Sequence, residues 1–302
     1  MPNRIIEIAT NNQKLSAYRG FLRIESEGNI RKDIPFNAIC AVIVTGHQIV
    51  YTNNLLSRLC EENIPLIILG ANYVPNGLLL SFVGQIKQTE IQYIQIAQKR
   101  PIYKQIWQCI IQEKIKNQSR VLDLFHKENP LSEMHKSVLS GDSSYKEGFA
   151  AKLYFPALFG ENFVRDRNAE GVNAFLNYGY AVLRAALARY VVAAGLNPSY
   201  GVAHHNKRNA FCLVDDLIEP FRPIVDATVY QIFDNDLDLI ELTPNYKAQL
   251  SGLLTKEYMT LEGYSPLYMI LQQIVWDLVR IYKTQEVKFQ FNPYLFVDED
   301  DE

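Results

Sequence analysis

Residues 195–223 read GLNPSYGVAHHNKRNAFCLVDDLIEPFRP, and this stretch decides both the fold and the chemistry of the chain. Two adjacent histidines, His204 and His205, precede an acidic segment that contains Asp216 and Glu219. The two acids are three residues apart, so on a helix they share one face. A loop histidine beside carboxylates on one helical face can ligate a divalent metal ion.

A proline interrupts the acidic segment. Pro220 directly follows Glu219. In a continuing helix its ring removes a hydrogen bond and crowds the carbonyl of Asp216, four residues back. We therefore expect a kink beside the acids, which opens the backbone where a ligand can approach.

The segment before this stretch, residues 172–194, has the longest uninterrupted helical pattern. It ends at Gly195, with Pro198 just beyond. Most of its surface is apolar, as in a core helix, yet polar residues at intervals of four, three and four form one stripe. They are Asn173, Asn177, Tyr180 and Arg184. Because buried polar groups need partners, the favoured interpretation is that they satisfy neighbouring loops. The alternative is that they orient acids or touch phosphates.

The hydrophobic period divides the chain in two. Residues 1–85 contain short runs rich in Ile, Val and Phe that are separated by glycines, with one helix expected at residues 53–62. From about residue 85 the period becomes helical. We expect an α+β fold: a small N-terminal β-rich, β-sandwich-like domain at 1–85, a larger all-α C-terminal domain at 86–295 and an acidic tail at 296–302.

Composition excludes several classes of protein. The chain has 302 residues and a net charge of −3, so any DNA contact must come from a local basic face. Four cysteines without a CxxC pair argue against a zinc site or a disulfide framework and favour the reducing cytoplasm. The first residues lack the apolar run of a signal peptide, and no apolar run of about 18 residues occurs, so we expect no membrane span.

Single acids and histidines are weak signals on their own. Glu147 falls in the first turn of an expected helix, where a solvated acid suits the helix dipole, and that is the favoured interpretation for Glu147 alone. The combination around residue 204 is more informative, because acids and a histidine cluster beside Lys207, Arg208 and Arg222. A divalent ion with nearby cations is what a phosphodiester reaction needs.

These residues resemble a known family. LNYGYAVLRAALARYVVAAGLNPSYGVAHH, followed by LVDDLIEPFRPIVD, is similar to the CRISPR adaptation integrase, the Cas-one family. The upstream EGFAAKLYFPALFG is similar to that family's first catalytic motif. The resemblance covers nearly the whole chain and is specific over residues 147–226. The segment LVDDLIEPFRP is most similar to that of family members from type II systems.

The resemblance implies a catalytic metal site. In the family a glutamate, a histidine and a second acid bind the metal, and by motif these fall on Glu147, His204 and Glu219. His204 is chosen over its neighbour because the motif histidine lies three residues after the loop glycine, here Gly201. Some members use an acid one turn earlier, which makes Asp216 the reserve ligand. Mixed oxygen and imidazole ligation suits Mn²⁺, and the acids could also hold Mg²⁺.

The resemblance also implies an activity and partners. The family captures short DNA fragments and joins them to the CRISPR array, through attack of a fragment's 3′ hydroxyl on a phosphodiester. It works as homodimers bridged by a small Cas-two protein in a heterohexameric complex, and other type II adaptation and effector proteins are further expected partners. Cations in or beside the site are the expected contacts to double-stranded DNA, with Arg165 and Arg167 as exposed phosphate clamps. The full set is Lys152, Arg165, Arg167, Arg184, Lys207, Arg208 and Arg222.

Two alternatives stay open. A metal-dependent repair endonuclease on branched or single-stranded DNA would use the same site with water as the nucleophile. A non-catalytic DNA-end scaffold or dimerisation subunit would not need Glu147 or His204. Independently of the activity, we expect the β-rich domain to make most of the homodimer contact, because its strands AICAVIVTG and PLIILG carry surplus apolar surface and sheet edges invite pairing.

Overall fold

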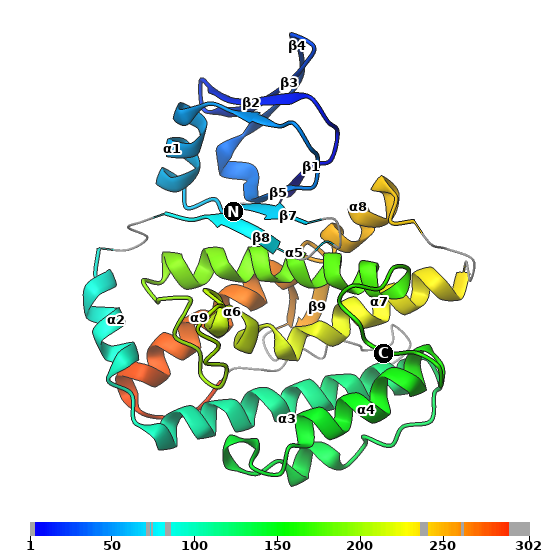
Figure 1. Ribbon diagram of the computed structural model, residues 1–302. Coiled ribbons are helices and arrows are strands. Elements are labelled where there is room, and N and C mark those ends of the chain that lie inside the picture. Colours follow the sequence, from blue (N-terminus) through cyan, green and yellow to red (C-terminus); the bar gives the residue numbers. More distant parts are fainter. Residues whose placement is uncertain are drawn as a thin grey trace.

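The computed structural model describes residues 4–70, 73, 75–81, 86–235, 241–260 and 263–289. Strands dominate the N-terminal part and helices dominate the rest (Figure 1), as the α+β prediction requires. The acidic tail predicted at 296–302 lies outside the described residues. None of the helices that the structure describes is long and apolar enough to span a bilayer.

Two four-stranded sheets form the N-terminal part. The first has the order β4-β3-β2-β6, and the second has the order β1-β5-β7-β8. The first contains β2 (Gln13–Tyr18), β3 (Phe21–Ser26), β4 (Asn29–Pro35) and β6 (Val50–Tyr51). The second contains β1 (Arg4–Ile8), β5 (Ile39–Val44), β7 (Leu66–Leu69) and β8 (Pro75–Leu79). In the second sheet β1, β5 and β7 run parallel, and β8 is antiparallel to β7.

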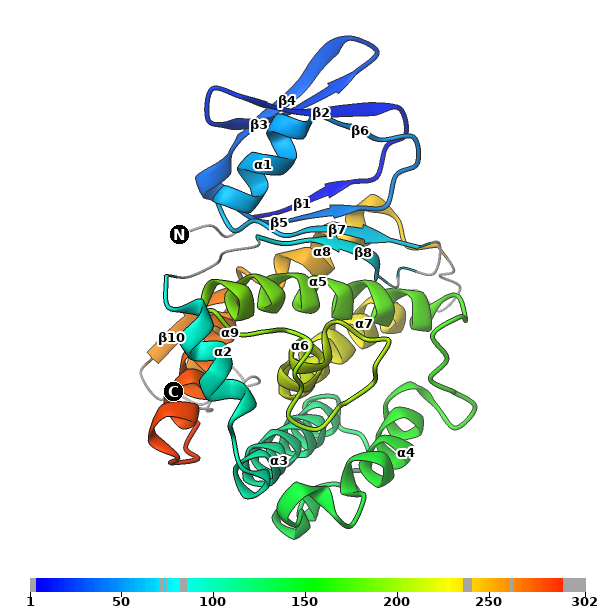
Figure 2. The same cartoon turned by 60° about the vertical axis from the view of Figure 1, so that its left-hand side comes forward.

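A small hydrophobic core lies between these two sheets. Leu15 and Leu22 of the first sheet meet Val42 of the second, and all three are fully buried. The helix expected at residues 53–62 is confirmed as α1 (Asn53–Glu61), which adds Leu55 and Leu59 to this core. The arrangement is a sandwich of two sheets with one helix beside it (Figure 2).

Strand β5 is buried on both of its faces. All six of its residues are buried, as is usual for a parallel strand with both faces covered. Ile39 and Val42 belong to the small core, whereas Ala41 and Ile43 belong to the large core of the helical part. For β5 the premise of surplus apolar surface for a homodimer is therefore wrong, since α5 of the same chain covers it, whereas β7 leaves Ile68 43% exposed. The homodimer itself stays a prediction.

Polar bonds fasten the second sheet to the helices. Arg189 of α5 (Val172–Ala193) donates from Nη1 to the carbonyl of Ile39 at 2.7 Å. Glu7 of β1 accepts from the hydroxyl of Tyr178 at 3.1 Å and pairs with Lys247 at 2.8 Å. The two parts of the chain thus share a sheet and are joined by polar contacts as well as by packing.

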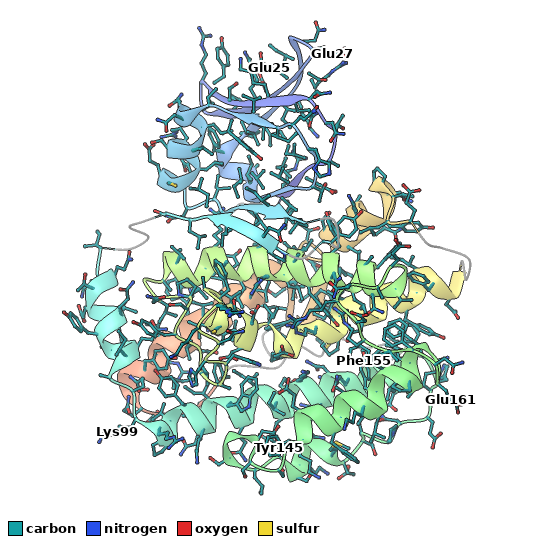
Figure 3. All side chains as sticks on the ribbon, in the orientation of Figure 1. Glu25, Glu27, Lys99, Tyr145, Phe155 and Glu161 are labelled. Atoms are coloured by element: carbon teal, nitrogen blue, oxygen red, sulfur yellow. The ribbon has the colours of Figure 1, made fainter. Side chains whose placement is uncertain are left out.

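The helical part places α5 across the sheet and α3 and α4 on the opposite side (Figures 1 and 2). The helices besides α5 are α2 (Gln88–Ile96), α3 (Arg100–Leu124), α4 (Lys146–Phe159), α6 (Cys212–Leu217), α7 (Arg222–Asn235), α8 (Pro244–Gly252) and α9 (Leu267–Thr284). Short 3₁₀ turns cover Phe36–Ala38, Met134–Ser137, Ser140–Asp142 and Glu219–Phe221. Figure 3 shows Glu25 and Glu27 at the far end of the first sheet, remote from Tyr145 and Phe155 at α4.

The prediction of an all-α C-terminal domain is wrong at one place. β9 (Glu257–Thr260) pairs antiparallel with β10 (Gly263–Pro266). Within β9, Glu257 is exposed and Tyr258 is buried, but Met259 and Thr260 are both half-buried, so only the first two residues alternate. Four residues give too short an alternation to stand out between two helical patterns.

Candidate active site

The start of α4 fixes the position of Glu147. Tyr145 precedes the helix with a left-handed φ of 53°. The carboxylate of Asp142 accepts from the backbone N–H of Lys146 at 2.8 Å and from that of Glu147 at 3.0 Å. This carboxylate satisfies two of the unpaired N–H groups of the first turn, in the manner of a helix cap. Glu147 therefore enters the site from a fixed backbone.

A buried lysine joins the two predicted glutamates. Lys114 of α3 is 8% exposed, and its Nζ lies 2.7 Å from Oε1 of Glu147 and 2.6 Å from Oε2 of Glu219. Burial lowers the pKa of Lys114, but the two carboxylates outweigh burial, so the pKa is raised overall. Glu147 is thus no solvated first-turn acid, and the structure brings it together with Glu219 as the sequence motif predicts.

Glu219 lies in the kink that Pro220 was expected to cause. The turn Glu219–Phe221 separates α6 from α7, and Asn117 of α3 donates to the carbonyl of Pro220 at 2.8 Å. Glu219 is 5% exposed, and Nε of Arg222 donates to its Oε1 at 2.8 Å. Burial alone would raise the pKa of Glu219, but Arg222 and Lys114 lower it to about 2. The carboxylate is therefore ionised at neutral pH.

Asp216 organises the histidine loop. Its side chain is fully buried and accepts from the backbone N–H of Val202 at 2.5 Å and of Ala203 at 2.9 Å. It also pairs with Nδ1 of His204. This hydrogen bond raises the pKa of His204 against the opposing effect of burial. Because Nδ1 is engaged, Nε2 is the ring nitrogen left for a ligand.

The loop leaves no room for a side chain at Gly201. A Cβ there would lie 2.3 Å from the carbonyl oxygen of His204 and 2.9 Å from Oδ2 of Asp216. The rings of His204 and of Trp107 on α3 meet edge to face, with their centroids 5.6 Å apart. The imidazole is therefore held by Asp216 on one side and by Trp107 on another.

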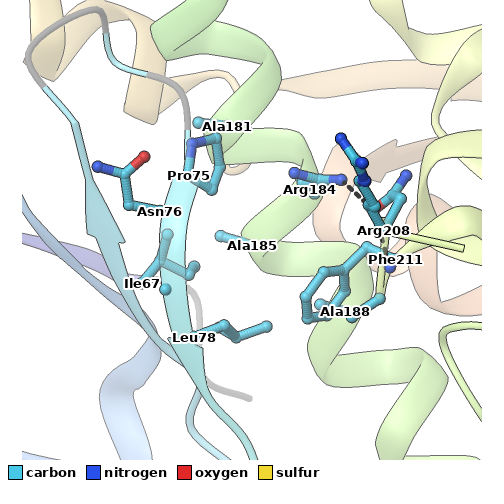
Figure 4. Close-up of a pocket in the computed structure, with 13 residues that line it drawn as sticks. Ile67, Pro75, Asn76, Leu78, Ala181, Arg184, Ala185, Ala188, Arg208 and Phe211 are labelled. Carbon is cyan, nitrogen blue, oxygen red and sulfur yellow. Dashed lines mark hydrogen bonds between the residues drawn. The ribbon is translucent and has the colours of Figure 1, made fainter.

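Arginines surround the mouth of this site. A cavity of about 400 Å³ is lined by both His204 and Glu219. Five arginines line the same cavity: Arg165, Arg167, Arg184, Arg208 and Arg222. Figure 4 shows an adjoining pocket between β8 and α5, with Arg184, Arg208 and Phe211 on its helix side. Since guanidinium groups bind phosphate oxygens well, the cavity suits a phosphodiester.

One predicted phosphate clamp is placed differently from the expectation. Arg165 is half-buried and donates to Oδ1 of Asn173 at 2.8 Å and to Oδ1 of Asn177 at 2.7 Å. The same amides donate to the carbonyls of Val164 and Arg167, so the polar stripe satisfies a loop, as favoured from the sequence. The expectation of an exposed Arg165 is therefore wrong, because the stripe of α5 binds it. Arg167 is exposed as expected.

The remaining predicted cations lie at different distances from the cavity. Arg184 is bound to Asp215 at 2.5 Å, and Arg208 is exposed at the rim. Lys207 is exposed and lines a neighbouring cavity with His205. Lys152 is exposed on α4 and is absent from the lining of the cavity. The arginines, more than the lysines, therefore form the basic face of the site.

The site favours a cation between its acids. Among the residues that the structure describes, no group of three or more His, Cys, Asp or Glu is arranged as a metal cage. The ammonium of Lys114 lies between the two glutamates. Oε2 of Glu219 is buried and makes no aligned hydrogen bond, although Lys114 is at ion-pair distance. A buried anionic oxygen in this state fits a divalent ion, and metal ligation by Glu147, His204 and Glu219 stays a prediction.

Lys114 was missed from the sequence. It lies between Ile110, Ile111 and Ile115, all fully buried, so the helical pattern alone could have marked it as a lysine inside a core face. A buried lysine needs an anionic partner. A lysine in a core face would therefore have predicted nearby acids, but it would not have shown which acids they are.

Comparisons with known proteins identify the family of the chain. A model of the family described as "CRISPR associated protein Cas1" matches residues 6–257. The "CRISPR-associated endonuclease Cas1" of Neisseria meningitidis serogroup C (strain 8013) is 38% identical over 243 residues, which are 80% of this chain and 79% of the relative.

Two solved structures have a similar fold. One, "Casposase bound to integration product", has a TM-score of 0.83 at 18% identity, and the alignment covers 97% of this chain and 94% of the casposase chain. Another, in the "Cas6-RT-Cas1--Cas2 complex", has a TM-score of 0.79 at 19% identity and covers 98% of this chain but 36% of the longer one. The matched segment 6–257 contains α4, the histidine loop and the turn of Glu219. On the strength of that match, this chain belongs to the CRISPR-associated Cas1 family.

Proposed function

We propose that this chain is the integrase of a CRISPR adaptation system, which joins captured DNA fragments to the array by attack of a 3′ hydroxyl on a phosphodiester. The observation that carries the proposal is the convergence of Glu147 and Glu219 on one cation, in a site whose cavity holds His204 and five arginines. The names of the relatives, an endonuclease and a casposase bound to an integration product, support a DNA-joining or DNA-cutting activity.

Each part of the site has a role in that reaction. Glu147, Glu219 and Nε2 of His204 would hold Mg²⁺ or Mn²⁺. The bound ion would supply Lewis acidity that activates the attacking hydroxyl and neutralises charge on the phosphate. Arg222 fixes Oε1 of Glu219, and Asp216 fixes the imidazole. The exposed guanidinium groups hold the phosphates beside the reacting one, so positioning contributes to the rate.

The choice between the two acids favours Glu219 as the third ligand. Both oxygens of Asp216 are occupied by the loop that it organises. Glu219 has one oxygen held by Arg222 and the other facing only Lys114. Asp216 is therefore a positioning residue in this proposal.

Partners follow from the family and its relatives. We propose that the chain acts on double-stranded DNA as a homodimer, bridged by a Cas-two protein into a heterohexamer within a type II system. The likeness to a chain of the "Cas6-RT-Cas1--Cas2 complex" supports the small partner. Two sites at fixed spacing are required to join both ends of a fragment, and the described part of one chain contains one such site.

An integration assay tests the proposal against its alternatives. A short duplex with labelled 3′ hydroxyl ends is mixed with a supercoiled array plasmid, Mn²⁺ and the small partner. The proposal expects the label to become covalently joined to the plasmid. Hydrolysed fragments without joined label would favour the repair endonuclease, and binding without either product would favour the scaffold.

A further inference from the structure

The most unusual group in the site is the ammonium of Lys114. It extends from the middle of α3, and its side chain is 10% exposed. Its Nζ contacts two carboxylates that come from different elements, α4 and the turn Glu219–Phe221. Among the residues that the structure describes, no other ion pair links Glu147 to Glu219.

The two carboxylates need a cation to stay close together. Like charges in a poorly solvated site repel strongly, and a buried ion loses more solvation than an exposed one. Arg222 compensates Glu219 but does not contact Glu147. Without Lys114, the metal-free protein would hold two carboxylates, Glu147 and Glu219, near each other with Arg222 as their one compensating cation.

We propose that Lys114 is a built-in counter-ion, which keeps the two ligand carboxylates in place before a divalent ion binds and competes with that ion for them. This inference rests on the metal assignment in the proposed function. The ammonium and the ion need the same two oxygens, Oε1 of Glu147 and Oε2 of Glu219. Arg222 holds the other oxygen of Glu219, so only Lys114 has to yield.

The lysine side chain is suited to this exchange. Its four-carbon stem is flexible, so the ammonium can leave the carboxylates without a shift of α3. Displacing it opposes metal binding, and the same contact stabilises the metal-free fold. Lys114 thus lowers the affinity for the ion and raises the stability of the protein without it.

The test compares Lys114→Met with Lys116→Met in the full chain without DNA. Lys116 is on the same helix and loses the same charge, but it lies 3.8 Å from Glu113 and away from the site. Mn²⁺ binding is measured by calorimetry, and thermal unfolding is measured in EDTA and in Mn²⁺. We expect Lys114→Met to bind Mn²⁺ about tenfold more tightly, which corresponds to about 1.4 kcal/mol. It should melt lower than the parent in EDTA, and Lys116→Met should match the parent in its affinity for Mn²⁺.

A second variant guards against general misfolding. In Lys114→Met with Glu147→Gln, the uncompensated repulsion is removed, so melting in EDTA should return toward that of the parent. Unchanged or weaker Mn²⁺ binding by Lys114→Met would overturn the counter-ion role while leaving the metal site standing. Absence of Mn²⁺ binding in parent and variant alike would overturn both.

Discussion

Asp216 binds His204 twice, through the backbone N–H at 3.3 Å and through the ring nitrogen Nδ1. One buried carboxylate therefore sets both the path of the loop and the orientation of the imidazole. A histidine that ligates a metal commonly has its other nitrogen held in this way. The pair explains why the first of two adjacent histidines, and not the second, is the functional one in our proposal.

Replacing Asp216 with asparagine should loosen the imidazole while keeping the size of the side chain. We expect strand joining to fall about 10- to 100-fold, as for other partners of metal-ligating histidines, with DNA affinity nearly unchanged. The hydrogen bond that raises the pKa of His204 would be weakened. The imidazole pKa of the metal-free variant, followed by NMR, should therefore be lower than in the parent. An equal pKa in both proteins would contradict the pairing.

Replacing His204 with alanine should abolish strand joining but leave most of the DNA affinity, because our proposal assigns that affinity to the arginines. His205→Ala is the matched control, since the His205 side chain is exposed and lines a different cavity from that of His204. The measurement is integration into a supercoiled array plasmid. Loss confined to the His205 variant would show that the wrong histidine was chosen, and full activity in both would favour the scaffold alternative.

Arg167 and Arg165 should now differ in their effects. Arg167→Glu should weaken binding to all DNA sequences alike and reduce the salt slope by about one unit, because an exposed phosphate contact releases a counterion. Arg165→Glu should in addition lower the melting temperature, since Asn173 and Asn177 lose their partner. Salt titrations of binding and thermal melts of both variants provide the comparison. Equal melting of the two would argue against a structural role for Arg165.

Asp226 should make stability depend on pH. It is 1% exposed and accepts from Tyr180, and burial raises its pKa from 3.8 to about 6. The folded state holds the proton more tightly than the unfolded state, so stability falls as pH rises toward 6. Glu219 has a pKa lowered from 4.5 to about 2, so its ionisation changes stability mainly below pH 4.5. Between pH 4.5 and 6 the parent should lose about 1.5 kcal/mol of unfolding free energy that Asp226→Asn does not lose.

Chemical denaturation at several pH values measures this difference. The asparagine oxygen can still accept from Tyr180, so the comparison isolates the charge. Parallel pH profiles for parent and variant would refute the assignment to Asp226.

Local spacing predicted more of the site than long-range contacts did. The loop glycine, His204 and the kink at Pro220 follow from neighbouring residues, and the structure has them where the sequence indicates. Lys114 was missed because its partners lie far along the chain, on α4 and after α6. The exposure of Arg165 was misjudged because the sequence does not show that the loop bound by these two amides of α5 is the one that carries Arg165.

The fold shows the same division. The helix at α1 and the change of period near residue 85 were readable from local patterns. The burial of β5 was not, since an apolar strand looks alike whether its second face meets another chain or α5 of its own. The pair β9–β10 was missed because four residues carry little periodic signal.

The sheet shared by both cores makes the molecule mechanically continuous. α5 is bonded to β5 through Arg189 on one side, and Arg184 of the same helix lines the cavity. Tightly packed interiors transmit displacement with little slack. A partner protein that binds the sheet containing β5 would therefore rotate α5 together with that sheet. The angle at which the partner binds would then set the orientation of the arginines toward the DNA.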